Sequence, residues 1–302
     1  MASYDWEPVD IVFDDEQSHE EPMGSKKKFW VKAPDGVFWL FKYSRVVNGE
    51  TRNEDWAEWL VHRLAGLLGV PSAVIRPANC EGRRGIVSRT VLSPDGRERL
   101  VHGNELIRDF DSEYQLDTRR ENPKYTVETV ARALRNVGPP VGFDALATFT
   151  GFQCMAGYFV LDAWVAGRDR HHENWAAIER EGTFTLSPSF DHGNALGFQV
   201  RPEEAIRLAS DEAVLERWLD RGTSHHFAQR PSLVSIARDA LTAAGGSVEA
   251  YWAHQLGSIP DDEIEAVVSA VPDDLMSVES RTFVISLLKT NRRRVVDGIR
   301  NR

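Results

Sequence analysis

The stretch RDRHHENWAAI, residues 168–178, places many ionisable and amide side chains directly after a long apolar segment and then becomes apolar itself. Residues 145–166 are mostly hydrophobic, which predicts a buried core helix. After the polar stretch, residues 175–179 and 184–190 predict two strands joined by a tight turn. The polar residues are therefore expected to form a loop that connects a buried helix to a β-hairpin.

The predicted hairpin brings a second acidic segment close to this loop. If residue 181 is the centre of the turn, Asn174 faces Pro188. Asp191 then lies just beyond the end of the strand, alongside the loop that contains Asp169. Three oxygen-bearing side chains therefore converge at one end of a small sheet. Hard oxygen ligands of this kind suit Mg²⁺, which is usually held by one or two carboxylates and by substrate phosphates.

The first ninety or so residues are predicted to be rich in strands, and the sequence Pro-Asp-Gly at 34–36 is a strong hairpin signal. The expected strands cover residues 9–13, 28–33, 37–43, 72–77 and 84–92. The third of them is apolar on both faces, and Lys42 shares a face with Phe38 and Leu40. A lysine on the inner side of such a strand requires a partner of opposite charge.

A candidate partner lies on the helix that follows. The stretch NEDWAEWLVHRLAGLLGVP, residues 53–71, has apolar residues at helical spacing, and a glycine and a proline end it. Asn53 is expected to cap its start. Glu54 and Glu58 lie one turn apart along the edge of the apolar stripe, and helix geometry alone does not choose between them as the partner of Lys42.

The rest of the chain is predicted to be helical from about residue 100, apart from the hairpin. Besides the helix that precedes the polar loop, the expected helices cover residues 202–220, 232–245, 248–256, 261–270 and 277–299. A β-rich lobe with one helix, followed by a helical lobe, is an α+β layout with two lobes. We expect the N-terminal, nucleotide-binding lobe to span residues 1–92 and the C-terminal, catalytic lobe to span residues 93–302.

Composition narrows the class of protein. The chain has 302 residues, of which 42% are hydrophobic and 27% charged, and its net charge is −10. An acidic chain is not expected to bind the nucleic-acid backbone directly. One disulfide between Cys80 and Cys154 is formally possible, but Cys154 lies in an apolar helical run and is expected to be buried. We find neither a secretory signal nor an apolar run that spans a bilayer, and expect a cytoplasmic protein.

The polar residues occur in the order that phosphoryl transfer uses. That reaction needs a carboxylate to orient the attacking hydroxyl, an amide and a carboxylate to hold a metal ion, and a lysine on the phosphates. Asp169, Asn174 and Asp191 supply the first three groups, and Lys42 supplies the fourth. Each fragment is weak alone, but their order along one chain is a strong signal.

The motifs resemble those of the HipA-like serine/threonine kinases, bacterial relatives of the eukaryotic protein kinases and the phosphoinositide kinases. The resemblance extends over nearly the whole chain from about residue 23. The matching stretches are MGSKKKFWVK, WLFKYSR, EDWAEWLVHRLAGLLGVP, LVHGNELI, DRHHENWAAI, LSPSFDHGNALG, SHHFAQRPSL and the C-terminal IPDD with FVISLLKTNRRRV.

The resemblance implies a protein-kinase-like fold and an enzyme that transfers the γ-phosphoryl group of ATP to a serine or threonine hydroxyl of a protein, with Mg²⁺. It implies that Asp169 is the catalytic base and that Asn174 and Asp191 are the metal ligands. It also implies that Lys42 holds the α- and β-phosphates and pairs with Glu58 rather than with Glu54.

The nucleotide site implied by the resemblance includes a phosphate loop with a single glycine, Gly24, which Ser25 and Lys26 are expected to supplement. The adenine is expected to lie against the backbone of residues 87–92, and Arg89 in this segment is a further candidate for binding the nucleotide.

Other functions stay open. DRHHEN also matches the DRHxxN motif of phosphoinositide kinases, so the acceptor is alternatively a lipid headgroup or another small molecule. The segment after Asp191 is net acidic, which counts against a lipid. A non-catalytic nucleotide-binding module is a third hypothesis. A zinc site built from His171, His172 and His192 is disfavoured, because adjacent histidines on a loop rarely face one ion.

Partners are weakly constrained by the sequence. Some HipA-like kinases are toxins neutralised by a small DNA-binding protein, so a small antitoxin-like partner is one expectation that the resemblance carries. The segment SHHFAQRPS is expected either to contact the substrate or the activation segment, or to be a packed surface loop.

Overall fold

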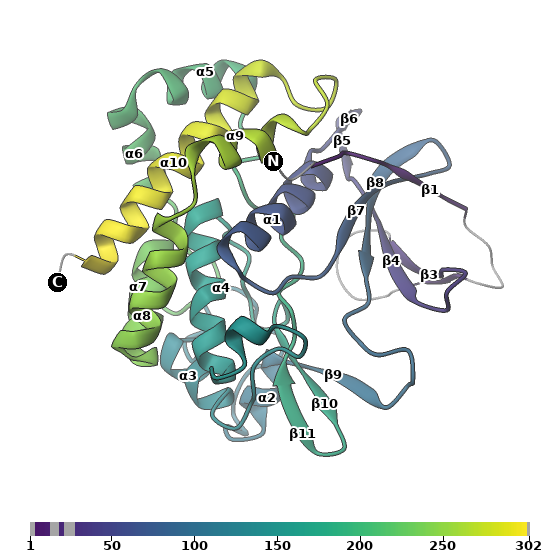
Figure 1. Ribbon diagram of the computed structural model, residues 1–302, viewed down its shortest axis with the longest axis vertical. Coiled ribbons are helices and arrows are strands. Elements are labelled where there is room, and N and C mark those ends of the chain that lie inside the picture. The colour runs from purple at the N-terminus through teal and green to yellow at the C-terminus, as the bar shows by residue number, and fades with distance from the viewer. Residues whose placement is uncertain (1–3, 13–17, 21–27, 301–302) are drawn as a thin grey trace.

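The computed structural model describes residues 4–12, 18–20 and 28–300, with residues 18–20 and 300 described without their side chains. A twisted sheet with one helix forms the N-terminal part, and helices form most of the remainder (Figure 1). The predicted α+β, two-lobed architecture is therefore confirmed. Gly24, Ser25 and Lys26, the predicted phosphate loop, lie outside the described residues.

The large sheet has the strand order β1-β7-β8-β4-β3-β2, in which only the outer pair β1 and β7 is parallel. Its strands are β1 (Val9–Ile11), β2 (Ser18–Glu20), β3 (Lys28–Lys32), β4 (Phe38–Tyr43), β7 (Ile75–Cys80) and β8 (Arg83–Arg89). A separate short hairpin joins β5 (Val46–Val47) to β6 (Glu50–Thr51). Strand β2 lies between the strands expected over 9–13 and 28–33, where the sequence analysis expects no strand, and it is on the edge of the sheet.

The two faces of β4 serve different purposes. Phe41 and Tyr43 pack with Phe29 and other residues in a small core on one face. Leu40 and Lys42 face the opposite way and line a cavity. The alternation of side chains along a strand thus sends the lysine of the predicted apolar strand toward the cleft rather than into the core.

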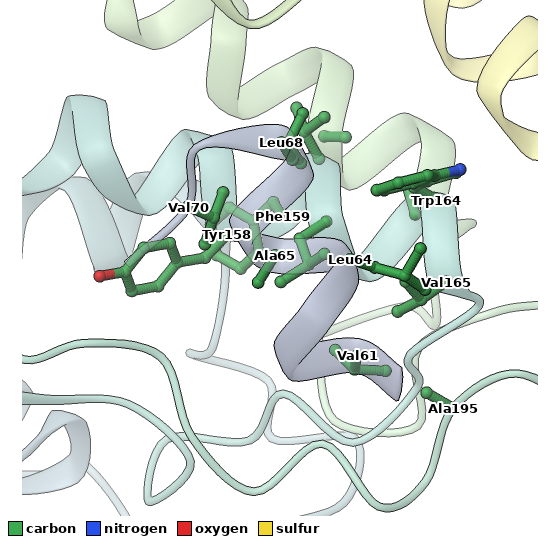
Figure 2. Packing of buried hydrophobic residues seen from close by; sticks show 14 of the residues in the cluster. Val61, Leu64, Ala65, Leu68, Val70, Tyr158, Phe159, Trp164, Val165 and Ala195 are labelled. Carbon is green, nitrogen blue, oxygen red and sulfur yellow. The ribbon is translucent and has the colours of Figure 1, made fainter. Parts of the chain in front are cut away.

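Helix α1 (Glu54–Leu68) is buried around most of its circumference, because it lies between the large sheet and the helical lobe (Figure 1). Its apolar residues Leu64, Ala65 and Leu68 belong to the same buried cluster as Tyr158 and Phe159 (Figure 2). One continuous core therefore joins the two parts of the chain. The expected capping of the helix start is not found: the Asn53 side chain makes no cap bond and instead accepts a hydrogen bond from Arg84 Nη2 at 2.8 Å.

A second sheet of three strands lies below the first in Figure 1, with the order β11-β10-β9. It contains β9 (Glu98–His102), β10 (Ala176–Arg180) and β11 (Thr183–Leu186). The expectation that residue 100 begins the helical part is wrong, because β9 pairs with β10 along its whole length. Its few residues are too short a run to show a clear alternation in the sequence.

The predicted register of the hairpin is wrong by one residue. Arg180 pairs with Thr183, so that Glu181 and Gly182 alone form the turn, and Pro188 does not face Asn174 in a ladder. Both turn residues have positive φ, 52° and 79°. A two-residue turn of this kind matches the twist of the flanking strands and sets the pairing.

The helical lobe contains nine α-helices among the described residues. They are α2 (Gly103–Arg108), α3 (Val127–Ala133), α4 (Gly151–Val165), α5 (Pro202–Ser210), α6 (Glu212–Asp220), α7 (Leu233–Ala244), α8 (Gly246–Gly257), α9 (Asp261–Ser269) and α10 (Val278–Arg300), with a 3₁₀ turn at Asp144–Leu146. The expected helix over 145–166 begins only at residue 151, where Thr150 and Gln153 form a capping box. The single helix expected over 202–220 is divided by Asp211, which caps α6.

Both cysteines are free and buried, as expected for Cys154. Within the part of the chain that the structure describes, no helix combines the length and the apolar character needed to cross a bilayer.

Candidate active site

Two cavities meet between the large sheet and the helical lobe. The first, of about 550 Å³, is lined on the sheet side by apolar residues that include Trp30 and Leu40, and on the lobe side by Phe190. The second, of about 470 Å³, is lined mainly by polar and charged residues. Lys42 and Asp191 line both cavities. The arrangement suits an apolar, flat ligand in the first cavity and a polar one in the second.

Lys42 is buried where the cavities meet, with 8% of its surface exposed. Its Nζ donates to Glu58 Oε1 at 3.0 Å and to Asp191 Oδ1 at 3.0 Å. Burial alone would lower the pKa of this ammonium, but the charges of Asp191 and Glu58 outweigh that effect and raise the pKa. Glu54 instead accepts a hydrogen bond from Arg45 Nε at 2.5 Å. Of the two candidates on α1, the structure thus places Glu58 against the lysine.

Asp191 follows β11 on an irregular segment, and its φ of 61° lies in the left-handed region that non-glycine residues rarely adopt. Next to it, His192 is buried and its Nε2 lies 2.9 Å from Ser189 Oγ. The neighbouring histidine is thereby fixed inside the protein while the Asp191 side chain remains 42% exposed. A backbone held in an uncommon conformation beside a cavity is typical of functional positions.

Asn174 is fixed by the polar loop itself. Its Nδ2 donates to the backbone oxygen of Asp169 at 2.7 Å, which leaves Oδ1 as the atom that can bind a cation. Asn174 and Asp191 line the first cavity together. Among the described residues, no group of three or more His, Cys, Asp or Glu side chains is placed to hold a metal ion. An amide and a carboxylate that are completed by substrate phosphates fit Mg²⁺.

The loop is anchored by a buried ion pair that the sequence analysis missed. Arg170 Nε and Nη2 donate to the two carboxylate oxygens of Asp162, both at 2.8 Å, and Nη1 donates to the backbone oxygen of Asn174 at 2.9 Å. Burial raises the pKa of Asp162, and the charge of Arg170 opposes this. The only signal in the sequence was one aspartate inside an otherwise apolar helix.

Aromatic side chains hold the same loop from a second direction. Tyr125 donates to the backbone oxygen of Arg170 at 3.1 Å and accepts from Trp175 Nε1 at 2.9 Å. His172 Nδ1 lies 2.7 Å from the Tyr114 hydroxyl. Trp175 is buried, as a core residue should be. Tyr114 and Tyr125 come from a connection whose role the sequence did not indicate.

Position 103, the glycine in LVHGNELI, has no room for a side chain. A Cβ atom on Gly103 would lie 2.2 Å from the Trp175 ring and 2.7 Å from the backbone oxygen of His172. Gly103 N also donates to the backbone oxygen of Trp175 at 3.0 Å. The start of α2 therefore packs directly against the loop, at a distance that only glycine permits.

Asp169 lines the second cavity, and its side chain is 42% exposed. Its Oδ1 lies 2.8 Å from Nε2 of His226, which belongs to the SHHFAQRPS segment. No pattern in the sequence joins two residues so far apart in the chain. Asp169 is thus half-buried beside one histidine and open to the polar cavity.

The remaining candidate, Arg89, ends β8 with an exposed side chain and lines the first cavity. Thr90 and Leu92 of the segment expected to face the adenine line it too. The structure therefore gathers Lys42, Arg89, Asp169, Asn174 and Asp191 around one cleft, and Glu58 is buried against Lys42.

No protein-family model matches the sequence, and no curated protein sequence matches it. Solved structures do match. The chain is similar to the Helicobacter pylori proinflammatory kinase CtkA, with a TM-score of 0.73 and 14% identity over 97% of this chain and 96% of that one. It is also similar to a chain of the Shewanella oneidensis MR-1 toxin–antitoxin complex of HipA, HipB and operator DNA, with a TM-score of 0.55 and 12% identity over 96% of this chain and 68% of that one. The chain thus has the HipA-like kinase fold that its motifs predict.

Proposed function

We propose that this chain with a HipA-like kinase fold is an ATP- and Mg²⁺-dependent kinase that phosphorylates a serine or threonine hydroxyl of a protein. The observation that carries the proposal is the meeting of an apolar and a polar cavity at Lys42 and Asp191, with Asp169 facing the polar one. The apolar cavity is suited to the adenine and ribose. The polar cavity is suited to the acceptor.

On the nucleotide side, Lys42 would bind the α- and β-phosphates. Its raised pKa keeps the ammonium charged across the physiological range, and Glu58 holds it in the cleft. Asn174 and Asp191 would hold the Mg²⁺ ion. When bound, the ion supplies positive charge that offsets the charge on the phosphates during transfer. Arg89 at the cavity rim is a further candidate contact for the nucleotide.

On the acceptor side, Asp169 would orient the hydroxyl and take its proton. Its position in the polar cavity, half exposed, permits contact with a hydroxyl group brought in from solvent. Positioning of this kind, combined with charge stabilisation at the phosphates, is sufficient for phosphoryl transfer because the protein forms no covalent intermediate.

The proposal is tested by incubating the full chain with γ-labelled ATP, Mg²⁺ and a cell lysate, then separating protein from lipids and metabolites. Label in protein that is lost with the Asp169→Asn variant supports the proposal. Label found only in lipid or small molecules would show that the acceptor is one of these and not a protein. Thermal stabilisation by Mg²⁺-ATP with no transfer and no hydrolysis would contradict a kinase and favour a nucleotide-binding module.

We also propose a cytoplasmic location and a small antitoxin-like protein partner. The second idea draws on the similar structure, which is a complex of HipA with HipB and operator DNA. The net charge of −10 gives no reason to expect direct binding of this chain to nucleic acid. Purification of the tagged chain from its native cells, with and without nuclease treatment, tests both the partner and any bridging nucleic acid.

A further inference from the structure

His226 lies between two oxygen atoms. Its Nε2 is 2.8 Å from Asp169 Oδ1, and its Nδ1 is 2.5 Å from the backbone oxygen of Arg119. A carbonyl oxygen and an ionised carboxylate both only accept hydrogen bonds, and a neutral imidazole has a single N–H to donate. With an ionised Asp169, the hydrogen on Nε2 is donated to Oδ1, which ties one carboxylate oxygen to the imidazole.

The imidazole is rigidly held. Its side chain is 7% exposed, the His226 backbone N–H donates to Ser224 Oγ at 3.1 Å, and the Asn122 N–H donates to the His226 backbone oxygen at 3.2 Å. Phe227, the next residue, packs against Tyr125 with ring centroids 4.3 Å apart. Tyr125 also bonds the polar loop. The histidine and the loop are thus fixed to one framework.

We infer that His226 is a positioning residue for Asp169, which rests on the proposed role of Asp169 as the base. A carboxylate rotates easily about its last torsion, and its two oxygens then exchange places. His226 binds Oδ1 and leaves Oδ2 as the oxygen that meets the acceptor hydroxyl. During transfer, the hydroxyl proton passes to Oδ2 as the new O–P bond forms. The bond to the bridging oxygen of ATP breaks, and ADP keeps that electron pair.

The inference is tested with His226→Ala, His226→Phe and His226→Gln, with His225→Ala as the matched control. The rates measured are hydrolysis of Mg²⁺-ATP and transfer to dephosphorylated casein. We expect the Ala and Phe variants to lower kcat about 100-fold, because a base that is displaced by about 1 Å loses that much. The KM for ATP stays unchanged, because His226 does not line the first cavity.

The glutamine variant separates positioning from packing. Its side-chain amide can donate to Asp169 Oδ1, so we expect kcat within about 10-fold of the wild type. The control is expected to behave as the wild type, because His225 is a half-buried neighbour that does not line the polar cavity. A glutamine variant as slow as the alanine variant would contradict the positioning role, as would an alanine variant with normal kcat.

A spectroscopic measurement tests the contact without turnover. The ¹⁵N signals of the His226 imidazole should change on substitution Asp169→Asn, because Nε2 loses its carboxylate partner. Unchanged signals would show that the pair does not form in solution. If Asp169→Asn keeps normal turnover, the proposed base is wrong. If Asp169→Asn is inactive while every His226 variant is fully active, the base stands and the positioning role is wrong.

Discussion

The charged residues in and beside the polar loop have two different environments, one on each side of the loop. On the inner side, Arg170 and Asp162 are almost completely buried. The guanidinium nitrogens donate hydrogen bonds to carboxylate or backbone carbonyl oxygens. On the outer side, the carboxylates of Asp169 and Asp191 are both 42% exposed and border cavities. The inner pair satisfies its own hydrogen bonds, whereas the outer carboxylates are accessible from the cavities. Burial and completeness of pairing therefore separate structural charges from the charges available for chemistry.

The largest expected effect falls on the outer side. Asp169→Asn should lower kcat by about 10⁴-fold, because the amide cannot accept the hydroxyl proton. The affinity for Mg²⁺-ATP and the thermal midpoint should change little, because the side chain is half exposed and does not line the first cavity. Steady-state kinetics and differential scanning fluorimetry check both parts. A variant that unfolds instead would place Asp169 among the structural charges.

Breaking the inner pair should instead lower the stability of the protein. Asp162→Ala leaves Arg170 as a buried, uncompensated charge, which costs about 3–5 kcal/mol of unfolding free energy. Urea denaturation followed by tryptophan fluorescence measures this. The matched control is Glu204→Ala, which breaks the exposed pair with Arg207 and should cost less than about 1 kcal/mol. Equal losses in the two variants would remove the distinction between buried and exposed charge.

A smaller effect is expected where α2 touches the loop. Gly103→Ala inserts a methyl group 2.2 Å from the Trp175 ring, so the loop or the helix must shift. Overpacking of this kind costs about 1–3 kcal/mol. The control is Gly66→Ala, where a Cβ meets nothing within 4 Å. If the two alanine variants are equally stable, the close approach of α2 to the loop does not hold in solution.

The smallest effect concerns pH. Burial lowers the pKa of His172 to about 4, well below the value of about 6.5 in an unfolded chain. The unfolded state then binds more protons, so stability is present above about pH 6.5 and is lost as the pH falls toward 4. His172→Gln should reduce the loss of unfolding free energy between about pH 6.5 and pH 4 by up to about 2 kcal/mol relative to the wild type. Thermal unfolding at several pH values checks it, and an unchanged slope would show that His172 is not buried in the neutral form.

The outer, chemical residues were more predictable from the sequence than the inner, structural ones. Asp169, Asn174 and Asp191 follow one another within a short span, so their order and the hairpin between them suffice to place them together. Lys42 could be placed by the alternation along its strand. Local patterns of this kind survive folding because neighbours in sequence remain neighbours in space.

The rest depends on contacts between distant segments. His226 lies 57 positions after Asp169, so no local pattern joins the two. Arg170 and Asp162 are only eight positions apart, but one lies in the loop and the other in α4, so their contact depends on how the loop folds back on the helix. The register of the hairpin depends on whether Glu181 adopts a positive φ, which its identity does not specify. Strand β9 forms because β10 lies beside it, not because of a strong alternation in its own residues.

The central claim is that Asp191, Asn174 and Lys42 form one site for a nucleotide and a metal ion. Calorimetric titration of ATP into the wild type and the Asp191→Ala variant, each with and without Mg²⁺, tests it most directly. We predict that Mg²⁺ tightens ATP binding to the wild type and has no such effect on the variant. Equal tightening in both proteins, or no binding of ATP to the wild type under either condition, would contradict the account.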